Sequence, residues 1–152
     1  MILSALVVVG VATLAFFYVR LNRQARLNWL KKVNLVGRWQ LQTGGESHRE
    51  EAQRETEGER IVELSFLGTG PDLDAGQVTL THVDASGGQR TEVTRWQLVG
   101  HTLTIEIAGV PARFELTYFK PGHIALDDAA GLRGLYLKVA DNVVALRSRR
   151  DG

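Results

Sequence analysis

The first nineteen residues, Met1 to Val19, constrain this chain more than any other stretch, because they carry no charged side chain. Their only polar side chains are Ser4, Thr13 and Tyr18. A helix of this length spans about 28 Å at a rise of ~1.5 Å per residue, which is close to the ~30 Å hydrocarbon core of a bilayer. The stretch therefore predicts a transmembrane anchor over residues 1–19, with the rest of the chain outside the bilayer.

A cleaved signal peptide is the alternative to a retained anchor. A secretory signal has a basic segment before its apolar core and small residues at the cleavage site after it. Here the apolar run ends in Phe16, Phe17, Tyr18 and Val19, and Arg20 follows directly. Bulky aromatic side chains suit the interface between membrane and water better than a peptidase site. This ending favours a retained anchor, with Phe16, Phe17 and Tyr18 at the membrane interface.

Residues 20–34 form a basic segment without Gly or Pro, which predicts that the helix continues out of the membrane as a stalk. The residues expected at the membrane interface are Arg20, Arg23, Arg26, Trp29, Lys31 and Lys32. Lys and Arg within ~15–20 residues of a span mark its cytoplasmic side, and they also attract anionic lipid headgroups. We therefore expect a single-pass protein with its N-terminus outside and its main domain in the cytoplasm. The opposite orientation stays open because the N-terminal tail is very short.

Charge divides sharply along the sequence, although the formal net charge is only +1. Residues 35–152 contain all 17 acidic residues against thirteen Lys and Arg, which gives this part a formal charge of −4. An acidic domain is a poor candidate for nucleic-acid binding, because that binding depends on neutralising phosphates. Cysteine is absent, which excludes disulfides, thiolate metal sites and thiol catalysis.

Residues 35–147 have the pattern of one β domain, and residues 148–152 follow as a tail. Short alternating apolar and polar stretches are separated by turn residues, as in antiparallel strands joined by hairpins. The expected strands cover residues 35–41, 61–67, 77–83, 92–99, 102–107, 112–119, 123–126, 135–139 and 143–147. Gly100-His101 and Pro121-Gly122 suit tight turns. We expect a mainly β fold, an antiparallel up-and-down barrel or curled meander of eight or nine short strands.

Alternation within these strands indicates which side chains face the interior. The inward candidates are mostly large: Trp39, Leu64, Phe66, Trp96, Leu103, Ile105, Phe114, Leu116, Leu135 and Leu137. A barrel of eight strands is only wide enough to be filled by side chains or to hold one small ligand. Large inward residues favour a filled core.

Residues 43–60 interrupt the β pattern with six Glu and three Arg. Ser47 and Glu50 have the spacing of a capping box, so a short solvated helix fits as well as a mobile loop. One hypothesis is an acidic docking surface. The other is a charged excursion that keeps a sheet edge soluble.

Residues that carry chemistry are scattered through the sequence. The four histidines, His48, His82, His101 and His123, lie in separate elements without metal-ligand spacing. Asp72-x-Asp74-x-Gly76 has the start of a calcium loop but lacks its later ligands. Neither G-x-S-x-G nor a phosphate-binding glycine loop occurs. We therefore expect neither an enzyme nor a metal or cofactor site.

Gly37-Arg38-Trp39, at the head of the first strand, resembles the G-x-W motif of lipocalins and lipocalin-like (calycin-type) domains. The run over residues 96–105, followed by residues 114–116, looks like the hairpins of small bacterial lipocalin-like domains. This resemblance implies a small β-barrel in which Trp39 plugs one end and a basic side chain from the last strand packs over it. Arg147 matches that basic residue by its order along the chain.

Two hypotheses for function follow. The first is a non-catalytic accessory or scaffold subunit, whose anchor packs against other membrane protein subunits while its β domain braces a partner. The second is a lipocalin-like binding module that holds a lipid or other small apolar ligand in its barrel. The large inward side chains favour the first, because they leave little room for a ligand.

Overall fold

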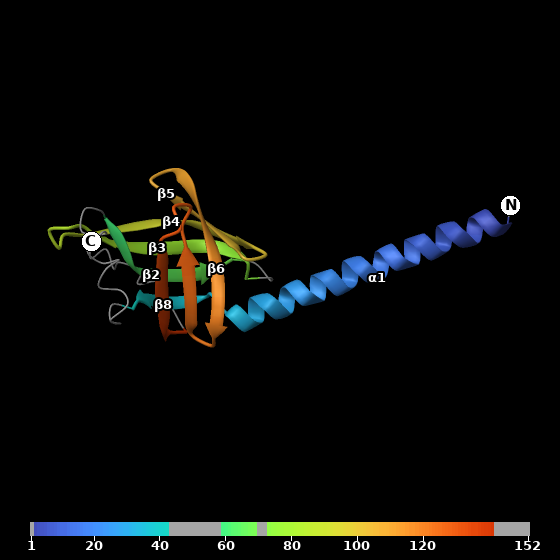
Figure 1. Cartoon of the computed structure of the whole chain (residues 1–152), viewed down its shortest axis with the longest axis horizontal. Coiled ribbons are helices and arrows are strands. Elements are labelled where there is room, and N and C mark those ends of the chain that lie inside the picture. The colour runs from blue at the N-terminus through green and yellow to red at the C-terminus, as the bar shows by residue number, and fades with distance from the viewer. Residues whose placement is uncertain (1, 43–58, 70–72, 142–152) are drawn as a thin grey trace, which may run out of the picture. The chain divides into compact units, whose positions relative to one another are not determined.

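The computed structural model describes residues 2–42, 59–69 and 73–141. One helix precedes eight strands in this part of the chain. In chain order they are α1 (Ile2–Val33), β1 (Gly37–Leu41), β2 (Arg60–Gly68), β3 (Ala75–Val83), β4 (Gln89–Val99), β5 (Thr102–Ile107), β6 (Val110–Lys120), β7 (His123–Asp127) and β8 (Arg133–Ala140). The chain divides into two compact units, Met1–Lys32 and Val33–Gly152, of which the first is helical and the second contains the strands (Figure 1).

α1 is one unbroken helix of 32 residues, which corresponds to a length of about 48 Å. It runs from the apolar segment straight through the basic segment, which confirms that the helix continues past residue 19. The hydroxyl of Thr13 donates a 2.7 Å hydrogen bond to the carbonyl of Val9, so this polar side chain is satisfied within the helix. Asn34 follows α1 with a φ of 46°, the left-handed conformation that commonly ends a helix.

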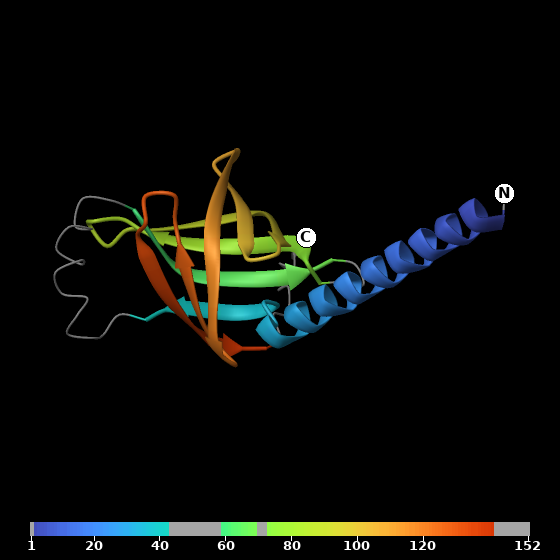
Figure 2. The same ribbon diagram turned by 45° about the vertical axis from the view of Figure 1, so that its right-hand side comes forward.

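The eight strands form a closed antiparallel barrel in which each strand pairs with the next and β1 pairs with β8 (Figures 1 and 2). Closure by short turns makes this an up-and-down barrel, which confirms the predicted fold class. The ninth expected strand, residues 143–147, lies outside the described residues. Most of the charged segment, residues 43–58, lies outside them as well.

The strand register turns alternate side chains into the barrel. Trp39 pairs with Leu64 and Phe66 pairs with Val78, so large apolar residues meet on the inner face. The largest fully buried side chains of the barrel are Trp39, Phe66, Leu64, Leu80, Leu98, Leu103, Ile105, Leu116, Ile124 and Val78. The interior is therefore filled by side chains, as predicted from the size of the inward residues.

The inward prediction was wrong for β8. Trp39 on the inner face of β1 pairs with Lys138, so Tyr136 and Lys138 face inward while Leu135 and Leu137 lie on the outer face, half-buried. Tyr136 and Lys138 each combine an apolar body with a polar tip, so they fill interior space while the tip reaches a hydrogen-bond acceptor. Pairing with β1 decides this orientation, and the alternation within β8 alone is compatible with both faces.

The barrel has two distinct ends. We call the end where β1 begins the entry end; it also contains the β4–β5 and β6–β7 turns and the end of β8. The opposite end, which we call the distal end, contains the β3–β4, β5–β6 and β7–β8 turns. The polar, charged and aromatic side chains considered as candidate site residues lie mainly at these two ends and along α1.

Candidate functional site

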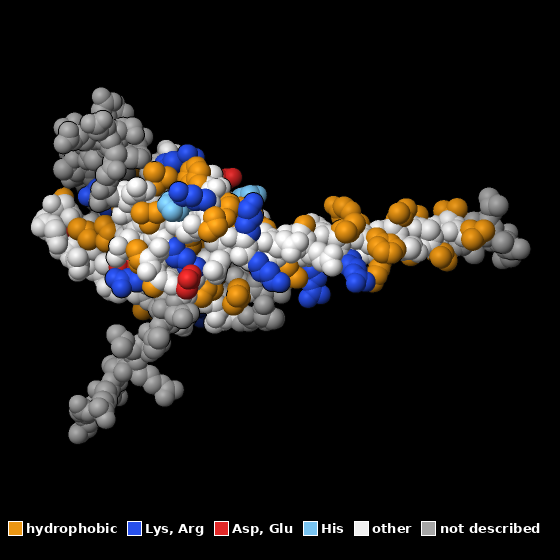
Figure 3. Space-filling model, turned by 90° about the horizontal axis from the view of Figure 1, so that it is seen from below, with side chains coloured by type: hydrophobic (Ala, Val, Ile, Leu, Met, Phe, Trp, Pro, Cys, Tyr) orange, Lys and Arg blue, Asp and Glu red, His pale blue; other side chains and the backbone are white. Residues whose placement is uncertain are grey.

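Over Leu6–Val33, α1 is long and apolar enough to cross a membrane. From Leu6 to Leu21, its large apolar side chains are exposed, from 54% for Phe17 to 73% for Leu14. Figure 3 shows hydrophobic side chains along the helix. Such a surface is typical of a helix that lies in lipid, because water disfavours a continuous apolar surface. A helix of this kind near the N-terminus is typical of a membrane anchor and also of a signal sequence.

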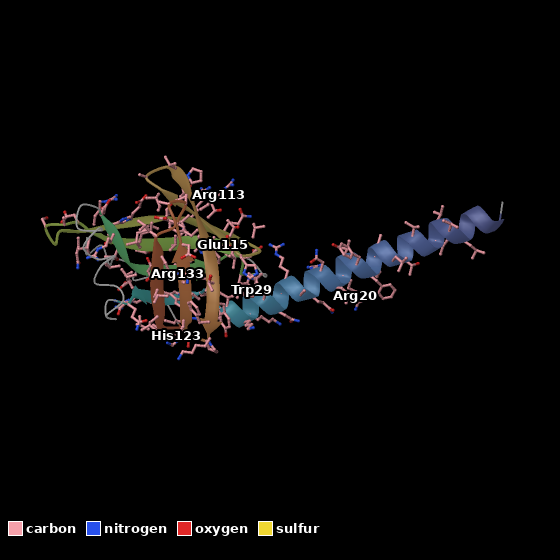
Figure 4. All side chains as sticks on the ribbon, in the orientation of Figure 1. Arg20, Trp29, Arg113, Glu115, His123 and Arg133 are labelled. Atoms are coloured by element: carbon pink, nitrogen blue, oxygen red, sulfur yellow. The ribbon has the colours of Figure 1, made fainter. Side chains whose placement is uncertain are left out.

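The expected interface residues lie on α1 just after its apolar part. The rings of Phe16 and Phe17 meet edge to face, with centroids 6.1 Å apart, and Tyr18 is exposed. The order along the helix is apolar, aromatic and then basic, as at a membrane interface. Figure 4 labels Arg20 and Trp29, of which Trp29 is half-buried. The basic residues exposed on the same helix are Arg20, Arg23, Arg26, Lys31 and Lys32.

Gly37 stands where the chain turns into β1 at the entry end. Its φ of +136° lies in a region that side-chain-bearing residues rarely adopt. A Cβ at this position would also collide with the carbonyl oxygen of Ala140 and with the side chain of Lys138. Glycine is therefore needed for both backbone conformation and the close approach of β8.

Trp39 lies inside the barrel near its entry end. Its side chain is fully buried, and its indole Nε1 donates a 2.7 Å hydrogen bond to the carbonyl of Leu35. The ammonium of Lys138 lies 5.5 Å from the centroid of the Trp39 ring, within the range of a cation–π contact. The same ammonium donates to the carbonyl of Asn34 at 2.7 Å and lies 3.0 Å from a carboxylate oxygen of Asp141.

Sequence reasoning placed Arg147 over Trp39, and Arg147 lies outside the described residues. Lys138, which the sequence analysis did not single out, is the basic residue found over the ring. The sequence signal for Lys138 was its spacing of two residues from Tyr136 on β8, which puts the two side chains on the same face of the strand. The apolar alternation of Leu135 and Leu137 predicts that these two residues face inward, which wrongly puts Lys138 on the outer face.

A cluster of polar side chains, His82, Arg90, Glu92 and Glu59, lies at the distal end. His82 on β3 pairs with Arg90 on β4 and is 4% exposed. One ring nitrogen of His82 lies 3.6 Å from Glu92 Oε2, and the other lies 3.9 Å from Glu59 Oε1. Arg90 binds Glu59 through two hydrogen bonds of 2.9 and 3.1 Å. This distal cluster was not predicted, because its members are spread over residues 59–92.

The side chain of Glu92 links β4 to the β5–β6 turn in the region where β4 and β5 are no longer paired by backbone hydrogen bonds. β4 pairs with β3 along residues 89–97, but β5 pairs with β4 only along residues 96–99. Beyond that point Glu92 Oε1 accepts a 2.8 Å hydrogen bond from the backbone amide of Ala108 in the β5–β6 turn. Ala108 has a φ of 51°, a strained conformation for alanine. The carboxylate thus satisfies a turn amide that no strand neighbour in the described chain reaches.

Replacing Glu92 with alanine should lower the free energy of unfolding by about 1–3 kcal/mol, the usual effect of leaving buried polar groups without partners. Glu92→Gln keeps an oxygen for the Ala108 amide and should cost less. Glu115→Ala, at an exposed position on β6 (Figure 4), is the matched control and should stay within about 0.5 kcal/mol of wild type. Denaturant unfolding of the full chain measures all three. Equal losses for Glu92→Ala and Glu115→Ala would contradict the role of this carboxylate.

Three surface carboxylates have their pKa lowered by local donors. The pKa of Glu59 is lowered chiefly by the hydrogen bonds from Arg90, and that of Asp127 by those from Arg133. The hydroxyl of Ser86 is the main cause of the lowered pKa of Asp84. Each charged form is therefore favoured in the folded state.

These lowered pKa values predict a barrel that is less stable in acid. A carboxylate whose pKa is lower in the folded than in the unfolded state adds stability above its unfolded pKa, about 4, and this is lost as the pH falls through its folded pKa. We expect the unfolding free energy to decline below about pH 4. Asp127→Asn should flatten that decline more than Glu106→Gln, the exposed control. Identical pH profiles for the two variants would contradict the prediction.

The other residues considered for metal binding remain apart. Among the described residues, no group of three or more His, Asp or Glu is placed to hold a metal ion. His101 and His123 lie at separate turns of the entry end, and His48 and Asp72 fall outside the described residues. Asp128 Oδ1 accepts backbone hydrogen bonds from Ala130 and Leu132, each 2.9 Å long, within the β7–β8 turn.

A groove of about 630 Å³ lies on the outside of the barrel, over β3 to β6. Trp96 donates its indole hydrogen bond to the carbonyl of Leu67 and is only 2% exposed, so its ring offers little surface for stacking. A small-molecule site usually encloses most of its ligand, whereas this groove is open along the surface. Its lining comprises Thr69, Ala75, Gly76, Gln77, Arg95, Trp96, Gln97, Thr104, Glu106 and Pro111.

No protein-family model matches the chain, and neither a curated protein nor a solved structure matches it.

Proposed function

We propose that this protein is a non-catalytic accessory or scaffold subunit of a membrane protein complex, anchored by α1, with its barrel at the membrane surface. The filled barrel interior is the observation that carries this proposal. Trp39, Phe66 and the other large inward side chains are almost fully buried, so packing takes up the space that a ligand would need. What the barrel offers is its outer surface, which suits contacts with proteins.

The proposal places α1 across the bilayer and the barrel in the cytoplasm. The absence of charge before Arg20 supports a retained anchor, and the five Lys and Arg of residues 20–32 support a cytoplasmic barrel. Membrane lipids and other membrane subunits are then its partners. Nucleic acid is not among them, since residues 35–152 are acidic.

Protease added to intact spheroplasts should spare the barrel, because the membrane shields a cytoplasmic domain. Changing Arg23, Arg26, Lys31 and Lys32 together to Glu should invert the orientation in part of the population, because it removes the charge bias. An immunoblot against a C-terminal tag measures both. Digestion of the wild-type barrel from outside would show the opposite topology.

Mild detergent extraction followed by sizing and native mass spectrometry tests the subunit role. We expect the chain to elute with other membrane proteins in a fixed stoichiometry. A chain that elutes alone at its own mass of 16.8 kDa plus detergent would contradict this role.

A lipocalin-like binding module is the second candidate, and the entry end of the barrel favours it. Gly37-x-Trp39 with Lys138 over the ring resembles the plugged barrel end of lipocalin-like domains, and we propose kinship with them on this basis. Native mass spectrometry separates the two candidates, because a binding module should retain a lipid or another small apolar molecule. The filled interior argues against that outcome.

A further inference from the structure

β4 (Gln89–Val99) is paired along most of its length on one side only. Its partner β3 covers residues 89–97, whereas β5 covers only residues 96–99 on the other side. β5 and β6 form a hairpin that rises away from β4 (Figures 1 and 2). On that side, residues 89–95 have no ladder partner within the described part of the chain, and we call them the open edge.

The open edge presents backbone groups to a further strand. Successive residues of an antiparallel strand direct their amide and carbonyl groups to opposite sides, so about half of these residues point away from β3. Glu92 bridges the split through its side chain at one point, where it binds the amide of Ala108. An edge of this kind is a template for strand addition, and only an extended segment satisfies such a row of donors and acceptors.

The side chains on the outer face of the open edge are Thr91, Val93 and Arg95. They alternate with Glu92 and Thr94, and all three are exposed, Val93 to 65%. Arg95 makes neither a hydrogen bond nor an ion pair with any residue that the structure describes. The open edge therefore sets an exposed valine and a guanidinium without an ion pair in the described chain two residues apart, beside backbone groups that no described strand pairs with.

We propose that the open edge binds an extended segment of another subunit, which adds a strand to β4. This inference rests on the proposed function and names the surface that binds the partner. The added strand carries an acidic residue opposite Arg95 and an apolar residue opposite Val93. Cross-strand pairs of opposite charge and of apolar side chains both stabilise neighbouring strands, and the backbone hydrogen bonds supply the rest of the affinity.

A second copy of this chain fits the open edge less well. Its own β4 would bring Thr91, Val93 and Arg95 to the shared outer face, and none of these is a carboxylate. Each Arg95 would then stay without a countercharge. Residues 43–58 of the same chain contain five Glu, but Ala52 is their only apolar side chain, so they offer nothing comparable to Val93. Residues 142–152 contain Val143, Val144 and Leu146, but three Arg outweigh their single acidic residue, Asp151, so their charge does not complement Arg95. Charge and hydrophobicity together therefore favour a segment of a different protein.

A synthetic peptide tests the open edge directly. The probe is a blocked, fluorescent peptide of nine threonines in which Glu and Val replace two residues two positions apart. One control peptide has Lys in place of Glu, and another carries N-methyl groups on alternate amides, which removes its hydrogen bonds along one side. Fluorescence anisotropy with the full chain in detergent should show binding of the probe, about tenfold weaker binding of the Lys peptide and none of the N-methyl peptide. Equal signals from the three peptides, or no binding of the probe, would overturn the proposal.

Two variants of the chain locate the binding. Val93→Lys places a charge on the open edge and should weaken binding of the probe severalfold. Val99→Lys is the matched control, because Val99 lies on the same strand, is 59% exposed and belongs to the part that β5 pairs with. Arg95→Glu should reverse the preference between the Glu and Lys peptides, whereas Arg113→Glu, at an exposed position on β6 (Figure 4), should preserve it. Equal effects of Val93→Lys and Val99→Lys would overturn the assignment to the open edge.

A photo-reactive residue at position 93, in native membranes, tests the natural partner. An adduct on a segment with an acidic and an apolar residue two positions apart supports the proposal. An adduct with residues 43–58, with a second copy or with lipid overturns it, and so does the absence of any adduct. If the complex survives extraction while Val93→Lys leaves it intact, the accessory role stands and the binding surface lies elsewhere on the chain.

Discussion

Replacing Trp39 with alanine should lower the free energy of unfolding by about 3–5 kcal/mol, the usual effect of deleting a large buried aromatic side chain. Trp39 is fully buried at the entry end, and its indole donates to the carbonyl of Leu35. Its removal leaves a cavity inside the entry end of the barrel and takes away the ring beneath the Lys138 ammonium. Against a total stability of about 5–15 kcal/mol, such a loss threatens folding itself. Denaturant unfolding of the full chain in detergent measures it.

Two variants control this experiment. Trp29→Ala should change the unfolding free energy of the barrel by less than about 1 kcal/mol, since Trp29 belongs to the helical unit. Trp39→Phe keeps an aromatic ring but leaves the Leu35 carbonyl without its donor, so an intermediate loss is expected. Equal small losses for Trp39→Ala and Trp29→Ala would show that Trp39 is not a core residue of the barrel.

The full chain should stay in the membrane pellet through high-salt and carbonate washes. Nineteen residues without charge bury far more apolar surface in a bilayer than surface charges contribute by attraction. Gly10→Arg with Leu14→Arg should release the chain into the soluble fraction, because each Arg near the helix centre costs about 2.5–3.5 kcal/mol. Fractionation followed by immunoblotting measures the distribution.

Asn22→Arg is the control for this second experiment, because it adds the same charge beyond the expected span. It should leave the chain in the pellet. Recovery of a soluble wild-type protein that starts near residue 20 would show that the apolar segment is a cleaved signal sequence.

Local sequence patterns determined which segments become strands and where the chain turns. Period-two alternation and turn pairs such as Pro121-Gly122 depend on residues close together in the chain, so they are visible without a structure. Eight expected strands are confirmed in the described residues, and Trp39 and Trp96 occupy the core as expected. Gly37 and Trp39 of the candidate site came from the resemblance to the G-x-W motif of lipocalins, which is also a local pattern because its residues are close together in the chain.

Only the pairing of strands in the tertiary structure decided which face of β8 is inward at the entry end and how Glu92 and β4 are arranged at the distal end. Leu135 and Leu137 follow the apolar alternation but lie outside, because the register of β8 against β1 turns Lys138 toward Trp39. At the distal end Glu92 binds an amide sixteen residues away, beyond the point where the β4–β5 ladder ends, and the end of that ladder leaves the open edge of β4. Alternation specifies that a strand has two faces, whereas a closed sheet specifies which face is inner. That choice depends on long-range partners, which no local pattern contains.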